Sequence, residues 1–240
     1  MIGKDLMNDF LKSMLHLVFP KRCIACDGVI YGKDSYICPD CNKKLKYIEE
    51  PVCLRCGRPS RGGIFCTECK VKHHSFERGR FVLGYEQIGS SVYRFKYQNR
   101  PEYASGYASI IYDRLGPWID MIHPDALVPV PIHRKRFIKR GYNQAALLAE
   151  ELSKLTGIPT MKDLIERARN TAPQKLFDRK HRQINMKKAF IVNQNDVKLG
   201  NVIVVDDIYT TGSTIDAVSY ELKRHGVNKV YFISITAAGT

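Results

Sequence analysis

The stretch Val202–Thr214, VIVVDDIYTTGST, constrains the fold of this chain more than any other segment. It begins with four apolar, β-branched residues, a pattern typical of a strand that is buried on both faces of a parallel sheet. Asp206 and Asp207 follow, where we expect the strand to end, and a hydroxyl-rich loop comes next. Residues 215–225 then have helical spacing, and Gly226 is expected to terminate that helix. The predicted order is strand, acidic pair, small-residue loop and helix.

The residue types in this stretch suit a sugar phosphate. The first turn of a helix carries unpaired N–H groups and a partial positive charge, so it attracts a phosphate. The loop adds hydroxyl donors, and its glycine lets the backbone approach a ligand closely. Carboxylates repel phosphate and instead suit sugar hydroxyls, directly or through a hydrated Mg²⁺. The predicted phosphate contacts are Thr210, Thr211, Gly212, Ser213 and Thr214, and the predicted catalytic acids are Asp206 and Asp207. The alternative is a strand–turn–helix in which these residues serve stability alone.

The same stretch resembles the PRPP-binding motif of type I phosphoribosyltransferases, which has four apolar residues, two acids and a TTGST-like loop. It has neither the Walker A pattern nor the glycines of a dinucleotide-binding loop. The resemblance implies that the ligand is PRPP with Mg²⁺ and that the domain is Rossmann-like. Alternating strands and helices also predict an α/β domain with a mostly parallel sheet. The expected strands span residues 81–85, 126–130 and 229–236, and the expected helices span 88–96, 103–115 and 145–155.

All eight cysteines precede residue 70 and form four CxxC pairs. Two cysteines that flank a tight turn can aim both sulfurs at one metal, and two such knuckles complete a tetrahedral zinc site. The predicted ligands are Cys23, Cys26, Cys38 and Cys41 in one site and Cys53, Cys56, Cys66 and Cys69 in the other. An interleaved pairing, in which the first pair joins the third, remains the alternative. Four thiolates leave no open position, so both sites are expected to be structural.

Several neighbours of the cysteines refine this expectation. Gly57 suits the turn of a knuckle. His73 and His74 are expected on a surface linker, the alternative being that one of them replaces a cysteine ligand. A disulfide framework would need an oxidising compartment, and no export signal is visible, so we expect zinc and a cytoplasmic location. Small zinc ribbons typically use their surface for nucleic acid, for a partner protein or for a neighbouring domain.

The net charge is +14, and the excess is concentrated in the middle of the chain. Residues 131–188 contain 15 Lys and Arg against 5 Asp and Glu. This imbalance predicts an anionic ligand, a nucleic acid or both, the alternative being a solvated basic surface. The chain contains no apolar run of 18 residues, so no transmembrane segment is expected. The predicted organisation is an amphipathic helix over residues 1–20, a double zinc ribbon over 21–75, and a phosphoribosyltransferase-like domain over 76–240.

A second resemblance covers nearly the whole chain. The segment 128–144, VPVPIHRKRFIKRGYNQ, is similar to the characteristic segment of the ComF, or ComFC, competence family, as are residues 171–174 (TAPQ), the final VDDIYTTGST and the cysteine-rich start. By this resemblance, residues 131–136 form the pyrophosphate loop, and residues 165–185 include a flexible loop over the site. The implied ligand contacts are Arg134, Arg136, Arg140 and Gln174. The implied partners are single-stranded DNA and a ComFA-type helicase, and the implied process is natural transformation.

Three functions are consistent with these patterns. The first is a competence protein that binds PRPP and handles imported single-stranded DNA. The second is a metabolic phosphoribosyltransferase for nucleobase salvage, which would transfer the pentosyl group to a base and release pyrophosphate. The third is a non-catalytic PRPP-sensing adaptor. The zinc module and the basic charge favour the first over the second, and the intact acid and hydroxyl motif counts against a vestigial site.

Overall fold

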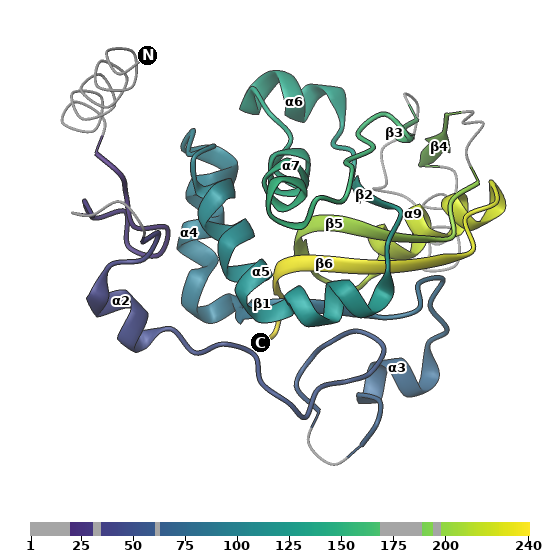
Figure 1. The fold of residues 1–240 in the computed structure, drawn as a ribbon, viewed down its shortest axis with the longest axis horizontal. Helices are drawn as coiled ribbons and strands as arrows, with labels where there is room; N and C mark the ends of the chain where they lie inside the picture. Colours follow the sequence, from purple (N-terminus) through teal and green to yellow (C-terminus); the bar gives the residue numbers. More distant parts are fainter. Residues whose placement is uncertain (1–19, 31–34, 61–62, 169–188, 194–197) are drawn as a thin grey trace, which may run out of the picture. The chain divides into compact units, whose positions relative to one another are not determined.

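The computed structural model describes residues 20–30, 35–60, 63–168, 189–193 and 198–240 (Figure 1). The chain divides into two compact units, Met1–Leu45 and Lys46–Thr240. The expected N-terminal helix lies outside the described residues, and so does most of the predicted flexible loop with Gln174. Within the part of the chain that is described, no helix is both long enough and apolar enough to cross a bilayer.

The first unit is built around one cysteine cluster. Its turn is closed by the backbone N–H of Asp27, which donates to the Cys23 carbonyl at 2.8 Å, and by an antiparallel bridge between Arg22 and Val29. Cys38 is the N-cap residue of helix α2, Pro39–Lys44, and Cys41 lies within that helix. Local hydrogen bonds of this kind order a segment that is too short to bury a core of its own.

The second unit contains a parallel sheet with the strand order β1-β6-β5-β2 (Figure 1). These strands span Gly79–Gly84 (β1), Lys229–Ala237 (β6), Asn201–Tyr209 (β5) and Ala126–Pro129 (β2). Strand β5 lies between two neighbours, and its apolar residues from Val202 to Val205 are fully buried. The prediction of an α/β domain with a parallel sheet is therefore confirmed.

Helices cover both faces of this sheet. Among its described residues, the second unit has the helices α3 (Thr67–Val71), α4 (Tyr85–Tyr97), α5 (Tyr103–Ile122), α6 (Arg134–Arg140), α7 (Gln144–Thr156) and α9 (Ser213–Arg224). Val218 and Leu222 of α9 share a core with Val202 and Val204 of β5, while α5 and α7 pack on each other (Figure 1). Because strand side chains alternate between faces, the intervening Ile203 is buried on the other side.

One helix is much longer than expected, and one helix was not predicted. Helix α5 continues past residue 115 and through Pro117, because Ile119 and Ile122 are buried in its last turns. Helix α6 occupies part of the segment that was expected to be a loop. The His133 side chain caps it by accepting a hydrogen bond from the Lys135 N–H at 3.1 Å.

A smaller antiparallel sheet pairs β3, Ile165–Arg167, with β4, Phe190–Val192. Ile165 and Phe190 are buried in the same core as α9. The two strands bracket the segment predicted to form the flexible loop. Its ends are therefore anchored on the α9 side of the sheet.

The second cysteine module, defined as the segment 51–75 around Cys53, Cys56, Cys66 and Cys69, belongs to the second unit. Its Cys53 and Cys56 are almost completely buried and lie in the core shared with Phe76, Phe232 and Val218. Gly57 adopts a φ of +78°, and a Cβ there would lie 2.6 Å from the carbonyl oxygen of Gly79. The knuckle turn predicted at Gly57 is therefore confirmed, and it presses directly on the start of β1.

Candidate functional site

Strand β5 extends farther than its sequence pattern indicated. It does not end at Asp206 but runs to Tyr209, so both acids lie within the strand. Asp206 pairs with Ser234 of β6, and Tyr209 pairs with Ala237. The long neighbouring strand β6 supplies backbone partners beyond the apolar run, which explains the extension. The predicted loop is accordingly shortened to the three residues Thr210–Gly212.

The two carboxylates have different surroundings. The Oδ1 atom of Asp207 lies 2.8 Å from Nζ of Lys96 in the last turn of α4. The Asp206 carboxylate accepts a hydrogen bond of 2.9 Å from the Asp207 N–H. Burial and the negative charge of Asp207 raise the pKa of Asp206 to about 7, although Lys96 opposes this shift. The positive charge of Lys96 therefore offsets only part of the cost of ionising Asp206.

Lys96 is a site residue that the sequence patterns did not identify. Its ammonium group comes from a helix more than 100 positions before the acids, and its side chain is only 17% exposed. The one sequence signal is the presence of basic residues in the last turn of α4, Arg94 and Lys96, which a helix of any function can carry. Its contact with Asp207 arises because α4 packs against β1 and β6, and β6 is the neighbour of β5.

The short loop leads directly into α9. Gly212 is the N-cap residue with a φ of +73°, and a Cβ at this position would lie 2.6 Å from the hydroxyl of Tyr209. Only glycine satisfies both constraints. The Thr211 and Ser213 hydroxyls lie 2.9 Å apart. The first turn of α9 therefore follows the acids within a few residues, with unpaired N–H groups and several hydroxyls.

The three arginines predicted to contact ligand have different environments. Arg134 and Arg136 are exposed in the first turn of α6. This helix follows β2, and the Val130 N–H bonds the Val205 carbonyl at 2.9 Å, so α6 begins at the same edge of the sheet as Asp206. Arg140 is already engaged. Its Nη1 lies 2.8 Å from Oε1 of Gln144, and its Nη2 lies 3.0 Å from the hydroxyl of Tyr97.

The cysteines form two clusters in sequential order. One consists of Cys23, Cys26, Cys38 and Cys41, and the other consists of Cys53, Cys56, Cys66 and Cys69. The sequential pairing is therefore confirmed over the interleaved one. In each cluster, the second pair occupies the N-cap and third position of a short helix, α2 or α3, rather than a second knuckle. Residues three apart on a helix face the same side, so this arrangement also aims both sulfurs at one point.

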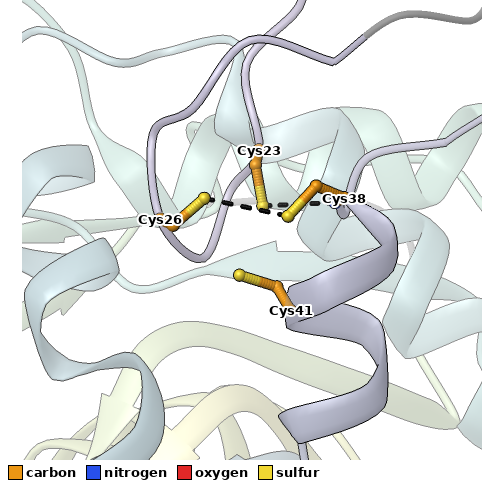
Figure 2. A group of neighbouring side chains, drawn as sticks. All are labelled: Cys23, Cys26, Cys38 and Cys41. Atoms are coloured by element: carbon orange, nitrogen blue, oxygen red, sulfur yellow. Dashed lines mark hydrogen bonds between the residues drawn. The ribbon is translucent and has the colours of Figure 1, made fainter.

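The dimensions of both clusters fit a tetrahedral metal. All four sulfurs of each cluster lie within 4.8 Å of one another, and Figure 2 shows those of the first cluster converging on one point. The Sγ atoms of Cys26 and Cys38 are 3.9 Å apart, and those of Cys56 and Cys66 are 3.7 Å apart. A tetrahedron with Zn–S bonds of about 2.3 Å has edges of about 3.8 Å. The clusters therefore support two structural zinc sites.

Two thiols of the second cluster have pKa values shifted in opposite directions. Burial disfavours the Cys53 thiolate, but backbone N–H groups of Cys56, Cys66 and Arg55 more than offset it and lower the pKa of Cys53 to about 7. Burial and the charges of neighbouring thiolates raise the pKa of Cys56 to about 12. A bound cation would remove that repulsion, as expected for a zinc site.

His74 is placed differently from the expected surface linker. Its side chain is fully buried, and its Nδ1 lies 2.9 Å from Oδ2 of Asp216. The ring stacks on Phe76 with centroids 4.6 Å apart. His74 therefore joins the cysteine module to α9 and lies outside both four-cysteine clusters.

The burial of the two clusters predicts different consequences of metal loss. We expect two zinc ions per chain, and one fewer in both Cys26→Ser and Cys56→Ser. Because Cys56 is part of the α/β core, Cys56→Ser should lower the melting temperature by about 5 °C or more. Cys26→Ser, in the other unit, should leave the main transition in place. Elemental analysis and calorimetry test this, and equal melting temperatures for the two variants would contradict it.

The raised pKa of Asp206 predicts a pH-dependent stability. Between about pH 4 and pH 7 the native protein keeps a proton that the unfolded chain has released, so stability falls as pH rises through this window. Asp206→Asn should remove that decline in the absence of ligand. Between about pH 4 and pH 8, the free energy of unfolding of the variant should rise relative to that of the wild type by up to about 4 kcal/mol, since each pKa unit corresponds to about 1.4 kcal/mol. Urea unfolding at several pH values measures this difference. The same pH dependence of the unfolding free energy in both proteins would contradict a raised pKa of Asp206.

The chain is similar to a known domain family and to a solved structure. Residues 14–70 match the model of the double zinc ribbon domain. A crystal structure of an adenine phosphoribosyltransferase is similar with a TM-score of 0.42 and 15% identity, over 70% of this chain and 84% of that one.

Curated relatives match over most of their length. Competence protein F of Haemophilus influenzae is 31% identical over 220 residues, which cover 88% of this chain and 95% of the relative. Competence protein ComFC of Bacillus subtilis is 30% identical over 214 residues, which cover 80% of this chain and 85% of the relative. DNA utilization protein YhgH of Escherichia coli is 27% identical over 225 residues, which cover 89% of this chain and 96% of the relative. With its two cysteine clusters followed by a parallel α/β domain, the chain belongs to the ComF/ComFC family of competence proteins.

Proposed function

We propose that this protein binds PRPP with Mg²⁺ at the carboxyl edge of β5. One observation carries the proposal: two adjacent acids, a three-residue loop and the first turn of α9 follow one another on a single continuous segment. In open α/β sheets, ligands bind beyond the carboxyl ends of the parallel strands. A ribose phosphate has an anionic group for the helix and hydroxyls for the acids.

Each part of the ligand then has matching groups in the protein. The 5-phosphate accepts hydrogen bonds from the backbone and hydroxyls of residues 210–214. The ribose hydroxyls donate to Asp206 and Asp207, directly or through water on Mg²⁺. The cation fits a site in which burial and a neighbouring carboxylate raise the pKa of Asp206. The diphosphate contacts the guanidinium groups of Arg134 and Arg136, with Arg140 as the third candidate and Gln174 assigned by the family resemblance.

Lys96 has a positioning role in this proposal. Its ammonium group pairs directly with Asp207 before ligand binds and only partly offsets the factors that raise the pKa of Asp206. Mg²⁺ supplies positive charge when it enters with PRPP, and the protein contributes fixed charges and donors around it.

Calorimetric titration with Mg-PRPP tests this function. The wild type should bind, and Asp206→Asn/Asp207→Asn should bind at least about tenfold more weakly, because two charge-assisted contacts are lost. Asp120→Asn, an exposed acid on α5, is the control and should bind as the wild type does. Absence of binding to the folded wild type would reject the proposal. Nucleobase-dependent release of pyrophosphate would instead support the salvage enzyme.

We further propose that the protein handles single-stranded DNA in the cytoplasm during DNA uptake, in partnership with a ComFA-type helicase. Relatives are named as competence proteins and as DNA utilization proteins. The net charge of +14 supports a polyanionic partner. Two four-cysteine clusters with metal-ligand geometry, in place of a disulfide framework, support a reducing compartment.

The α4–α6 face, defined as Tyr93, Tyr97 and the basic residues of α6, is the best candidate surface for DNA. The two tyrosines are 55% and 52% exposed, and their rings lie 5.0 Å apart. The Arg140 guanidinium lies 4.7 Å from the Tyr97 ring, which joins the aromatic pair to α6. The exposed cations of α6 are Arg134, Lys135, Arg136 and Lys139. Exposed aromatic rings beside cations are the usual platform for unpaired bases.

Fluorescence anisotropy with labelled oligothymidylate tests this surface. Tyr93→Ala/Tyr97→Ala should weaken binding about tenfold or more, because each stacked base contributes about 1–3 kcal/mol. Tyr112→Ala removes another exposed tyrosine, on α5, and should leave the affinity unchanged. Binding should also weaken steeply with salt. Equal affinities for the double variant and the wild type would exclude this face.

A further inference from the structure

The second cysteine module contacts the short loop between β5 and α9. A guanidinium nitrogen of Arg58, Nη2, donates a hydrogen bond to the carbonyl oxygen of Thr210. The ammonium group of Lys72 donates to the carbonyl oxygen of Thr211 at 2.8 Å. Arg58 follows Cys56 by two positions, and Lys72 follows Cys69 by three. Two cations from the module therefore hold two successive carbonyls of the loop.

These contacts determine where the loop N–H groups point. A trans peptide is planar, and its carbonyl and its N–H point in opposite directions. With the Thr210 and Thr211 carbonyls bonded to the module, the N–H groups of Thr211 and Gly212 point away from it. Those N–H groups belong to the loop proposed to receive the phosphate. Holding the carbonyls thus orients the donors for an anion before any ligand arrives.

The same module also holds the first turn of α9. The Asp216 carboxylate accepts a hydrogen bond from the backbone N–H of Ser75 at 2.9 Å and lies 2.9 Å from Nδ1 of His74. The Lys72 ammonium lies 3.3 Å from the same carboxylate. An unpaired acid in this turn would repel a phosphate. The module instead ties up the Asp216 oxygens and offsets their charge.

The position of Arg58 depends on the cysteine cluster. Its Nη1 lies 2.6 Å from Oε2 of Glu68, which lies between Cys66 and Cys69 in the chain. Its guanidinium also lies 5.2 Å from the centre of the Tyr209 ring. Both partners of the Arg58–Glu68 pair therefore come from segments that the four thiols bring together. Loss of the metal would release the pair and the loop together.

We propose that the second cysteine module is a metal-dependent brace for the phosphate loop, with Arg58 and Lys72 as its positioning residues. The proposal rests on the PRPP site proposed above. It links phosphate affinity to metal in the Cys53–Cys69 cluster and leaves affinity independent of metal in the Cys23–Cys41 cluster. A zinc ribbon that served only to bind nucleic acid or a partner would show no such link.

The test uses variants that keep the apolar stem and remove only the donor groups. Arg58→Met and Lys72→Met should each bind Mg-PRPP about tenfold more weakly than the wild type, because a charge-assisted hydrogen bond is lost. Both should retain two zinc ions and show faster amide exchange in residues 209–216. Arg58→Lys keeps the positive charge but lacks two separate donor nitrogens for Glu68 and Thr210. It should therefore bind Mg-PRPP more tightly than Arg58→Met and more weakly than the wild type. Arg55→Met is the matched control, since Arg55 bonds the Phe76 carbonyl and not the loop.

Metal loss provides the second arm. Cys26→Ser should keep the wild-type affinity for Mg-PRPP, and Cys56→Ser should lose it. Because Cys56→Ser can also unfold the core, the methionine variants decide the outcome. Wild-type affinity and wild-type exchange in both methionine variants would overturn the brace while leaving the PRPP site intact. A wild type that fails to bind Mg-PRPP would reject the PRPP site, and exchange in residues 209–216 would still test the brace.

Discussion

The burial of β5 between two parallel neighbours is the constraint on which the rest of this structure depends. Val202–Val205 are inaccessible to solvent, with α9 packed on one face and the α5–α7 layer on the other. Parallel pairing brings the ends of β2 and β5 to one edge, so α6, the acids and the first turn of α9 meet there. The same pairing draws both acids into the strand. The raised pKa of Asp206 is the electrostatic consequence of that burial.

The two cysteine modules show how one local design can serve two purposes. Each has a knuckle followed by a short helix, with matching hydrogen bonds from Asp27 to Cys23 and from Gly57 to Cys53. Cys26 is exposed in the first unit, whereas Cys56 is 1% exposed within the α/β core. Asp27 occupies the position that Gly57 has in the second module, where a Cβ would meet the start of β1. The same metal chemistry therefore organises a separate small unit in one case and part of the main core in the other.

Helix α4 connects the proposed ligand sites. Its last turn carries Lys96, which pairs with Asp207, and Tyr97, which contacts Arg140 of α6. The proposed DNA face thus begins one residue from the proposed PRPP site. Both sites use the positive charge that the sequence concentrates around α6, and they favour anionic ligands for the same electrostatic reason. A strand of DNA on this face would lie close to a bound sugar phosphate.

The sequence by itself determined the buried strand, the acidic pair, a loop, the following helix and the four CxxC pairs, because each is encoded by a local period or spacing. How the four pairs combine into two clusters was decided by the tertiary structure. Only the tertiary structure decided which distant groups complete the site. Arg58 and Thr210 are 152 positions apart, and His74 and Asp216 are 142 apart. No pattern in either segment identifies the other, since a lone Arg, Lys or His has the same sequence signature on any surface. Their contacts arise from burial of the second cysteine module against α9, which is a property of the whole core.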